Sequence, residues 1–132
     1  QGDYPRALEY YEKSLSICKS LFGDNHPDVA TSYNNIGFVY SSQGDYPRAL
    51  EYYEKSLSIL ESLFGVNHPD VATFYNNIGL FYTAQGNYSR ALEYFEKSLS
   101  IIVPLLGTEH NTTISLKQVI KEIKNLLPSK DQ

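Results

Sequence analysis

Residues 36–56 read IGFVYSSQGDYPRALEYYEKS, and residues 78–98 read IGLFYTAQGNYSRALEYFEKS. The second stretch follows the first at an offset of 42 residues, and the match extends over whole periods. Residues 1–42 and 43–84 differ at only eight aligned positions, whereas a third copy holds over about 85–101 and then diverges. Self-similarity at a fixed period of this length indicates a repeat protein.

Each period contains two helical patterns separated by glycine. In the first, apolar residues recur at helical spacing on two adjacent stripes, so we expect this helix to be covered on two sides. The second runs from about Pro27 to Ser42, because proline is tolerated in a first turn and Asp28 favours the positive end of the helix dipole. Gly37 lies inside this helix, where glycine costs about 1 kcal/mol relative to alanine. It predicts a close approach of the next helix at Ala49.

These positions resemble the signature of the tetratricopeptide repeat family. The matching residues are Ile36, Gly37, Tyr40, Gly44, Tyr46, Ala49, Tyr53 and Ser56, and they recur one period later. The 42-residue period, its Asn-His-Pro-Asp loop and its Tyr-Asn-Asn-Ile-Gly helix are similar to the kinesin light chain subclass. The resemblance implies an all-α fold of about six helices: a right-handed superhelical solenoid of antiparallel helix pairs, in which each first helix lines a concave groove.

We expect the whole chain to form a single array. Its parts are the second helix of a truncated repeat (1–26), two full helix pairs (27–68 and 69–110) and a C-terminal capping helix (111–127). In the last helix Lys121 replaces the glycine found at Gly37 and Gly79. A polar residue there suits a terminal cap, which repeat arrays need for solubility.

The side of the second helix opposite its apolar stripe carries the candidate ligand residues. They are Thr31, Asn34, Asn35, Phe38 and Ser42 in one pair and Thr73, Asn76, Asn77, Leu80 and Ala84 in the next. Asparagine is a poor helix-interior residue, and its amide both donates and accepts hydrogen bonds. The resemblance implies that these amides, Asn35 and Asn77 foremost, bind the backbone of an extended peptide. The alternative is that they satisfy loops or neighbouring helices of the scaffold.

The apolar members of this surface, Phe38 and Leu80, are expected to contact apolar side chains of the ligand. No lysine or arginine lies on it, which departs from the chaperone-binding clamps of the family. An internal segment of a partner is therefore a better candidate ligand than a C-terminal carboxylate.

Other residues with potential chemistry are interpreted as structural. His26, His68 and His110 recur with the period, but loops of successive helix pairs lie roughly 20 Å apart. That distance excludes a shared zinc ion, so we expect a structural role beside Pro27 and Pro69. Cys18 is replaced by Leu60 and Ile102 in the other copies, as expected of a packing position. No nucleophile–base pair or phosphate-binding loop is recognisable, so we expect no enzymatic activity, no metal and no cofactor.

Composition narrows the partners and the compartment. The formal net charge of −4 argues against nucleic acid, which requires a basic surface. No apolar run approaches the roughly 20 residues of a membrane helix, and no signal peptide is recognisable. The chain has a single cysteine, which favours a reducing compartment and hence a cytoplasmic location.

Three functions remain open. The first is a protein–protein interaction scaffold that binds a peptide or protein segment in its groove. The alternative is a structural spacer or self-association element within a larger repeat protein, which the near-identity of two copies slightly favours. A third possibility is a repeat array that regulates an enzyme on the same parent chain. An uncovered apolar stripe on the helix of residues 4–22 also predicts weak self-association through that helix.

Overall fold

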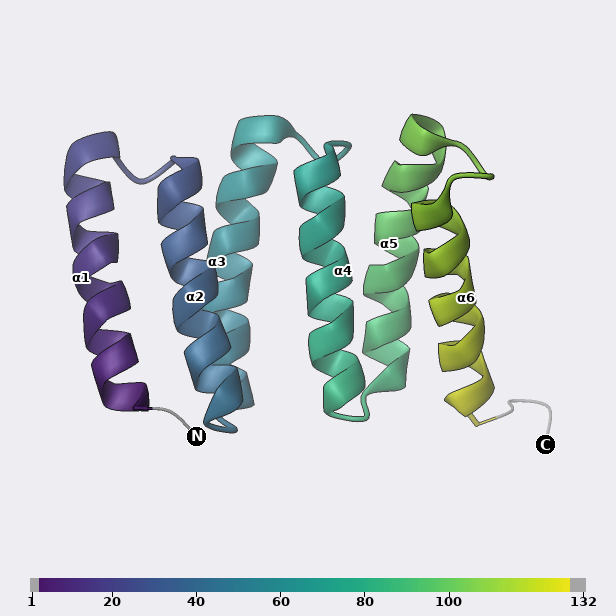
Figure 1. Cartoon of the computed structure of the whole chain (residues 1–132), viewed down its shortest axis with the longest axis horizontal. Coiled ribbons are helices and arrows are strands. Elements are labelled where there is room, and N and C mark those ends of the chain that lie inside the picture. The colour runs from purple at the N-terminus through teal and green to yellow at the C-terminus, as the bar shows by residue number, and fades with distance from the viewer. Residues whose placement is uncertain (1–2, 129–132) are drawn as a thin grey trace. The chain divides into compact units, whose positions relative to one another are not determined.

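The computed structural model describes residues 3–128, which form six α-helices and no β-strand (Figure 1). The helices are α1 (Tyr4–Phe22), α2 (Pro27–Ser42), α3 (Tyr46–Phe64), α4 (Pro69–Ala84), α5 (Tyr88–Leu106) and α6 (Asn111–Leu126). The chain divides into two compact units: unit 1, Gln1–Gly65, holds α1 to α3, and unit 2, Val66–Gln132, holds α4 to α6. Within each unit consecutive helices run in opposite directions (Figure 1). The expected all-α repeat fold is confirmed.

The helix boundaries follow from capping side chains that accept a hydrogen bond from the first turn. Asp3, Asp45 and Asn87 cap α1, α3 and α5 through side-chain oxygens that lie 3.2–3.3 Å from a backbone nitrogen. His26, His68 and His110 cap α2, α4 and α6 through Nδ1, at 3.0–3.1 Å from the backbone nitrogen two residues later. The structural role expected for the three histidines is confirmed.

The far ends of the longer helices need glycine. Gly23 ends α1 with a φ of 85°, a left-handed conformation that a side chain disfavours. At the other end of the chain, α6 finishes at Leu126, one residue before the expected limit, because Leu127 takes extended backbone angles.

The core of unit 1 is formed where α2 meets α3. Val29, Ala30 and Ile59 pack together, and the buried Ser56 hydroxyl donates a 2.7 Å hydrogen bond to the carbonyl oxygen of Ala30. A Cβ added at Gly37 would lie 2.8 Å from ring carbons of Tyr53 and 3.1 Å from the carbonyl oxygen of Ala49. The expected approach of Ala49 is therefore confirmed, and the Tyr53 ring comes closer still.

The core of unit 2 repeats this arrangement between α4 and α5 and adds α6. Ser98 donates a 2.9 Å hydrogen bond to the carbonyl oxygen of Ala72. At Gly79, an added Cβ would meet three ring carbons of Phe95 at 2.7–2.9 Å. The Phe95 ring thus lies over Gly79 as the Tyr53 ring lies over Gly37. None of the helices within residues 3–128 has the length and apolar character that crossing a membrane requires.

Candidate functional site

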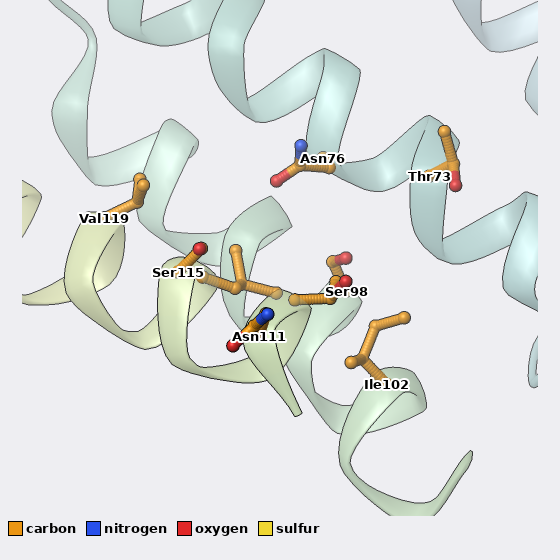
Figure 2. A pocket seen from close by; sticks show the side chains of 9 residues that line it. Thr73, Asn76, Ser98, Ile102, Asn111, Ser115 and Val119 are labelled. Carbon is orange, nitrogen blue, oxygen red and sulfur yellow. The ribbon is translucent and has the colours of Figure 1, made fainter. Parts of the chain in front are cut away.

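Unit 2 contains a cleft of about 380 Å³ that three helices enclose. Figure 2 shows Thr73 and Asn76 projecting from α4, with residues of α6 across from them and residues of α5 between. The lining residues are Thr73 and Asn76 of α4, Ser98 and Ile102 of α5, and Asn111, Thr112, Ser115, Leu116 and Val119 of α6. We call this the unit 2 cleft.

The chemistry of the unit 2 cleft is neutral. Amides and hydroxyls line it together with the aliphatic side chains of Ile102, Leu116 and Val119, and none of its lining residues is ionisable. The Ser98 hydroxyl is occupied by its bond to the Ala72 carbonyl, so Ser98 fixes α5 against α4. The remaining polar groups can pair with the alternating donors and acceptors of a polypeptide backbone. A mainly apolar hollow with a few polar groups is typical of ligand sites.

Unit 1 contains a second cleft, of about 510 Å³, between two helices. Its lining residues are Tyr10, Tyr11, Ser14 and Cys18 of α1, and Asp28, Thr31, Ser32 and Asn35 of α2. We call this the unit 1 cleft. Asp28 is its one ionisable carboxylate, and no base lies among the lining residues.

The two clefts occupy the same place in the repeat. Adding two periods of 42 residues converts Ser14 into Ser98 and Cys18 into Ile102. The same shift converts the four α2 residues Asp28, Thr31, Ser32 and Asn35 into the α6 residues Thr112, Ser115, Leu116 and Val119. What differs is a third helix. In unit 2, α4 closes the cleft with Thr73 and Asn76, whereas no described helix of unit 1 holds that position against α1.

Four of the ten residues expected from the sequence line a cleft. Thr31 and Asn35 line the unit 1 cleft, and Thr73 and Asn76 line the unit 2 cleft. The remaining six, which line neither cleft, are Asn34, Phe38, Ser42, Asn77, Leu80 and Ala84. Five of these six are exposed, and Asn34 is half-buried.

The four residues at helical spacing on each helix form one surface. On α2 this polar strip comprises Thr31, Asn35, Phe38 and Ser42, and on α4 it comprises Thr73, Asn77, Leu80 and Ala84. Phe38 and Leu80 stand out because they are 65% and 52% exposed. Each strip begins at a threonine that lines a cleft, so the cleft and the strip are continuous surfaces within their own unit.

Sequence reasoning missed the contributions of α6 and α5. Asn111, Ser115 and Val119 lie in the copy that diverges from the repeat. Ser115 and Val119 stand two periods after Thr31 and Asn35, so a comparison with α2 would have found these two, whereas Asn111 stands two periods after Pro27 and would not have been found. Cys18 is half-buried and packs against Val29 and Ala30, so the packing role expected for it is confirmed. Within residues 3–128 no three metal-ligating side chains lie close enough to hold an ion.

The tyrosines outside the clefts serve packing, as expected. The Tyr52 ring lies 6.0 Å from Tyr33 and 5.7 Å from Tyr40, and the Lys55 ammonium lies 5.0 Å from its centre. In unit 2, Tyr94 repeats these contacts with Tyr75, Tyr82 and Lys97. Burial, and secondarily the neighbouring Tyr40, raises the pKa of Tyr52. Such stacked rings and cations stabilise the helix pair from one side.

Comparison with solved structures places this architecture among known repeat proteins. The crystal structure of BtubC (BKLC) from P. vanneervenii is 25% identical over 93% of this chain, with a TM-score of 0.80. A putative kinesin light chain from Podosopora anserina, with nearly identical TPR-like repeats, shares the fold at 20% identity, 93% coverage and a TM-score of 0.75. The chain spans 49% and 58% of these two proteins. No curated protein matches the sequence.

The sequence profile of the Tetratricopeptide repeat family matches residues 1–62, 35–102 and 70–119. These overlapping matches cover most of the chain, including α1 to α5 and the first half of α6. The chain therefore belongs to the tetratricopeptide repeat family and is similar to its kinesin light chain members.

Proposed function

We propose that this chain is a binding scaffold whose clefts and polar strips hold an extended segment of a partner protein. Tetratricopeptide repeats generally mediate protein–protein interactions, and scaffolds of this family are generally not enzymes. The observation that carries the proposal is the neutral unit 2 cleft, in which Thr73, Asn76 and Asn111 present backbone-like donors and acceptors beside aliphatic side chains.

The ligand chemistry follows from the lining residues. Neither the clefts nor the strips contain a lysine or arginine, so a ligand held by a carboxylate or phosphate is disfavoured. An internal, uncharged segment fits better: its backbone pairs with the amides, and an apolar side chain enters beside Leu116 and Val119. Where such a segment continues along a strip, Phe38 or Leu80 offers it an exposed apolar contact.

The asparagine amides are suited to this task because the scaffold does not use them. None of the side-chain hydrogen bonds found within residues 3–128 engages Asn34, Asn35, Asn76 or Asn77, and no buried polar side-chain atom there lacks a partner. These amides therefore reach solvent, where a ligand would replace water.

The test is a selection of randomised 12-residue peptides on the immobilised chain, followed by titration of the enriched peptides. We expect enriched sequences with an uncharged core, and at least a three-fold loss of affinity in an Asn76→Ala variant. Asn125→Ala is the matched control, because Asn125 is an exposed α6 residue that lines neither cleft. Enrichment of acidic or C-terminal motifs, or equal effects of the two variants, would contradict the proposal.

A spacer function is the second candidate, and the observation that favours it is the near-identity of residues 1–42 and 43–84. Recognition surfaces usually diversify between repeats. Among the strip residues only Phe38/Leu80 and Ser42/Ala84 have changed. A selection that enriches no peptide above background would favour the spacer.

For location, we propose the cytoplasm. The chain carries one half-buried cysteine and no second cysteine with which to form a disulfide, which suits a reducing compartment. Fractionation of cells that express the tagged protein tests this, and recovery in a secretory compartment would contradict it.

A further inference from the structure

The three shorter helices, α2, α4 and α6, begin at histidines that can act as caps only while their rings are neutral. The Nδ1 atoms of His26, His68 and His110 accept a hydrogen bond from the backbone N–H two residues later, at 3.0–3.1 Å. A protonated imidazole carries hydrogen on both nitrogens, so it cannot accept this bond. Its positive charge would also face the positive end of the helix dipole. Protonation therefore removes the cap and adds a repulsion in its place.

Two of the three helices carry a charge that offsets this loss. In α2 and α4 the residue two positions after the histidine is an aspartate of the first helical turn, Asp28 or Asp70. The Asp28 carboxylate lies 3.9 Å from Nδ1 of His26, so a protonated His26 has an anion at hand. The aspartate also favours the positive end of the helix dipole by itself. We therefore expect the starts of α2 and α4 to tolerate protonation of their histidines.

The start of α6 differs from the other two in the surroundings of its histidine. The residue two positions after His110 is Thr112, and the first turn of α6 contains no acidic residue. The Phe22 ring stacks on His26 at 4.2 Å, but the residue two periods after Phe22 is Leu106. His110 is accordingly exposed, whereas His26 is half-buried. His110 is thus the histidine cap that protonation reaches most easily and that nothing beside it replaces.

Charged groups elsewhere around His110 do not supply the missing carboxylate. Among residues 3–128, no acidic side chain forms an ion pair with His110, although Glu109 precedes it in the chain. Helix α6 packs on α5, and residues 98–108, which include the end of α5 and the loop after it, contain no ionisable side chain. On α4, Asp70 lies in the first turn of that helix, and the first ionisable residue of α6 is Lys117, a cation. A proton on His110 therefore gains no anionic partner from these helices.

The turn that His110 caps borders the unit 2 cleft. Asn111, Thr112 and Ser115 line the cleft from α6, and Figure 2 shows Asn111 and Ser115 on that side of it. The buried Thr113 hydroxyl donates a 2.7 Å hydrogen bond to the carbonyl oxygen of Gly107, which keeps this turn attached to the preceding loop. Loss of the cap therefore loosens the first turn of α6 without releasing the whole helix, and it displaces the side chains that this turn presents to the cleft.

We propose that His110 makes the unit 2 cleft sensitive to acid. At neutral pH the uncharged ring caps α6 and holds Asn111 and Thr112 in place beside the cleft. As the pH falls from about 7.5 to about 5.5, within the range in which histidine ionises, the cap is lost and this side of the cleft loosens. The stabilisation by the cap is thus present at neutral pH and lost on acidification. The effect on ligand binding rests on the proposed function, whereas the loss of the cap does not.

The experiment compares thermal melting of the whole chain and its variants at pH 7.5 and pH 5.5 by circular dichroism. Between the two pH values, the melting temperature of His110→Asn should fall by about 3 °C less than that of the parent, because an asparagine cap does not ionise. Thr112→Asp, which supplies the carboxylate found in α2 and α4, should reduce the fall to a similar extent. His26→Asn is the matched control: it also exchanges a histidine cap for asparagine, but Asp28 already stands beside that cap, so its melting temperature should fall as much as that of the parent. Any peptide selected on the chain should bind the parent at least three-fold more weakly at pH 5.5 than at pH 7.5, and His110→Asn should remove most of this difference.

Three results would overturn the proposal. The first is an equal fall in melting temperature for the parent and His110→Asn, which would show that the cap does not respond to acid. The second is an equally reduced fall in His26→Asn, which would show that the response is not particular to α6. The third is a selected peptide that binds the parent equally well at both pH values although the melting temperatures respond as expected, which would separate the cap from the cleft. If no peptide can be selected, the proposed function fails, and the melting comparison still decides whether His110 is an acid-sensitive cap.

Discussion

The hydroxyl of Ser98 in α5 donates a hydrogen bond to the carbonyl oxygen of Ala72 in α4 across 2.9 Å, with both residues buried. Ser56 makes the same bond to Ala30 at 2.7 Å in unit 1. A buried hydroxyl thus fixes each helix pair at the same height, one period apart, and in unit 2 it joins two of the three helices whose side chains line the cleft.

Replacing Ser98 by alanine should lower the free energy of unfolding by about 0.5–1.5 kcal/mol, the net value of a hydrogen bond. Urea denaturation measures this. Ser100→Ala is the control, because the Ser100 hydroxyl bonds the Lys97 carbonyl on the exposed side of the same helix. Equal effects of the two changes would show that the Ser98 bond adds no stability of its own.

Replacing Gly79 by leucine should cost about 1–3 kcal/mol, as overpacking does, because the new side chain meets the Phe95 ring. Thermal melting measures the loss. A second change, Phe95→Leu, should recover part of it by removing the ring. At the equivalent position of α6 the preference reverses: Lys121→Gly should cost about 1 kcal/mol through helix propensity alone. An unchanged melting temperature for Gly79→Leu would contradict the close approach.

Replacing both Asn35 and Asn77 by alanine should weaken the binding of selected peptides while leaving the fold nearly intact. Each lost hydrogen bond contributes about 0.5–1.5 kcal/mol. Calorimetric titration and circular dichroism measure the two effects. Because Asn76 rather than Asn77 lines the unit 2 cleft, Asn76→Ala tells whether the ligand occupies the cleft or the strip of α4. A double variant that unfolds would assign the asparagines to the scaffold.

Replacing His110 by alanine should destabilise unit 2 by about 0.5–2 kcal/mol, because the α6 N-terminus loses the Nδ1 acceptor of the Thr112 amide. His110→Asn should retain the stability, since asparagine is a strong N-cap. Urea denaturation of the three proteins separates loss of the cap from loss of the ring. If the asparagine variant is as unstable as the alanine variant, the imidazole acts through some other contact.

Alkaline pH should destabilise unit 1. Burial raises the pKa of Tyr52 and Tyr53 above the ordinary value of 10.0, so the folded state favours the neutral phenols. Their stabilisation is present below pH 10 and is lost as the pH rises through the raised pKa values. Urea denaturation at neutral pH and at about pH 11 should show the loss. In the Tyr53→Phe variant, which carries the residue found at Phe95, the free energy of unfolding should fall less between the two pH values than in the parent. In the Tyr10→Phe variant, which changes an exposed tyrosine, it should fall as much as in the parent.

Helix positions were predictable because local chemistry determines them. Pro27 and Asp28 start α2, Gly44 follows its end, and the observed bounds Pro27–Ser42 agree with the expected ones. The contact of Gly37 with Ala49 was also predictable, since a glycine inside a helix indicates a close neighbour. The contact of Gly79 with Phe95 was not, because residue spacing does not tell how a ring turns over the facing helix.

The candidate site was predictable only in part. Helical periodicity correctly placed Thr31 and Asn35 on an accessible side of α2. It does not tell which of two adjacent asparagines borders a cleft, because that depends on the crossing of three helices. Because α6 was interpreted as a capping helix with an outer surface of lysines, Ser115 and Val119 on its other side were not predicted to line a cleft.

Lys121 has a consequence for how such a gene can grow. A 42-residue block that carries glycine at this position, such as residues 1–42 or 43–84, can be duplicated in tandem, because each copy offers its glycine to the ring that follows. A helix that carries lysine at this position, as α6 does at Lys121, leaves no such gap for a ring. The glycine-bearing blocks are thus the ones suited to tandem duplication, and the presence of only eight differences between residues 1–42 and 43–84 fits the duplication of such a block.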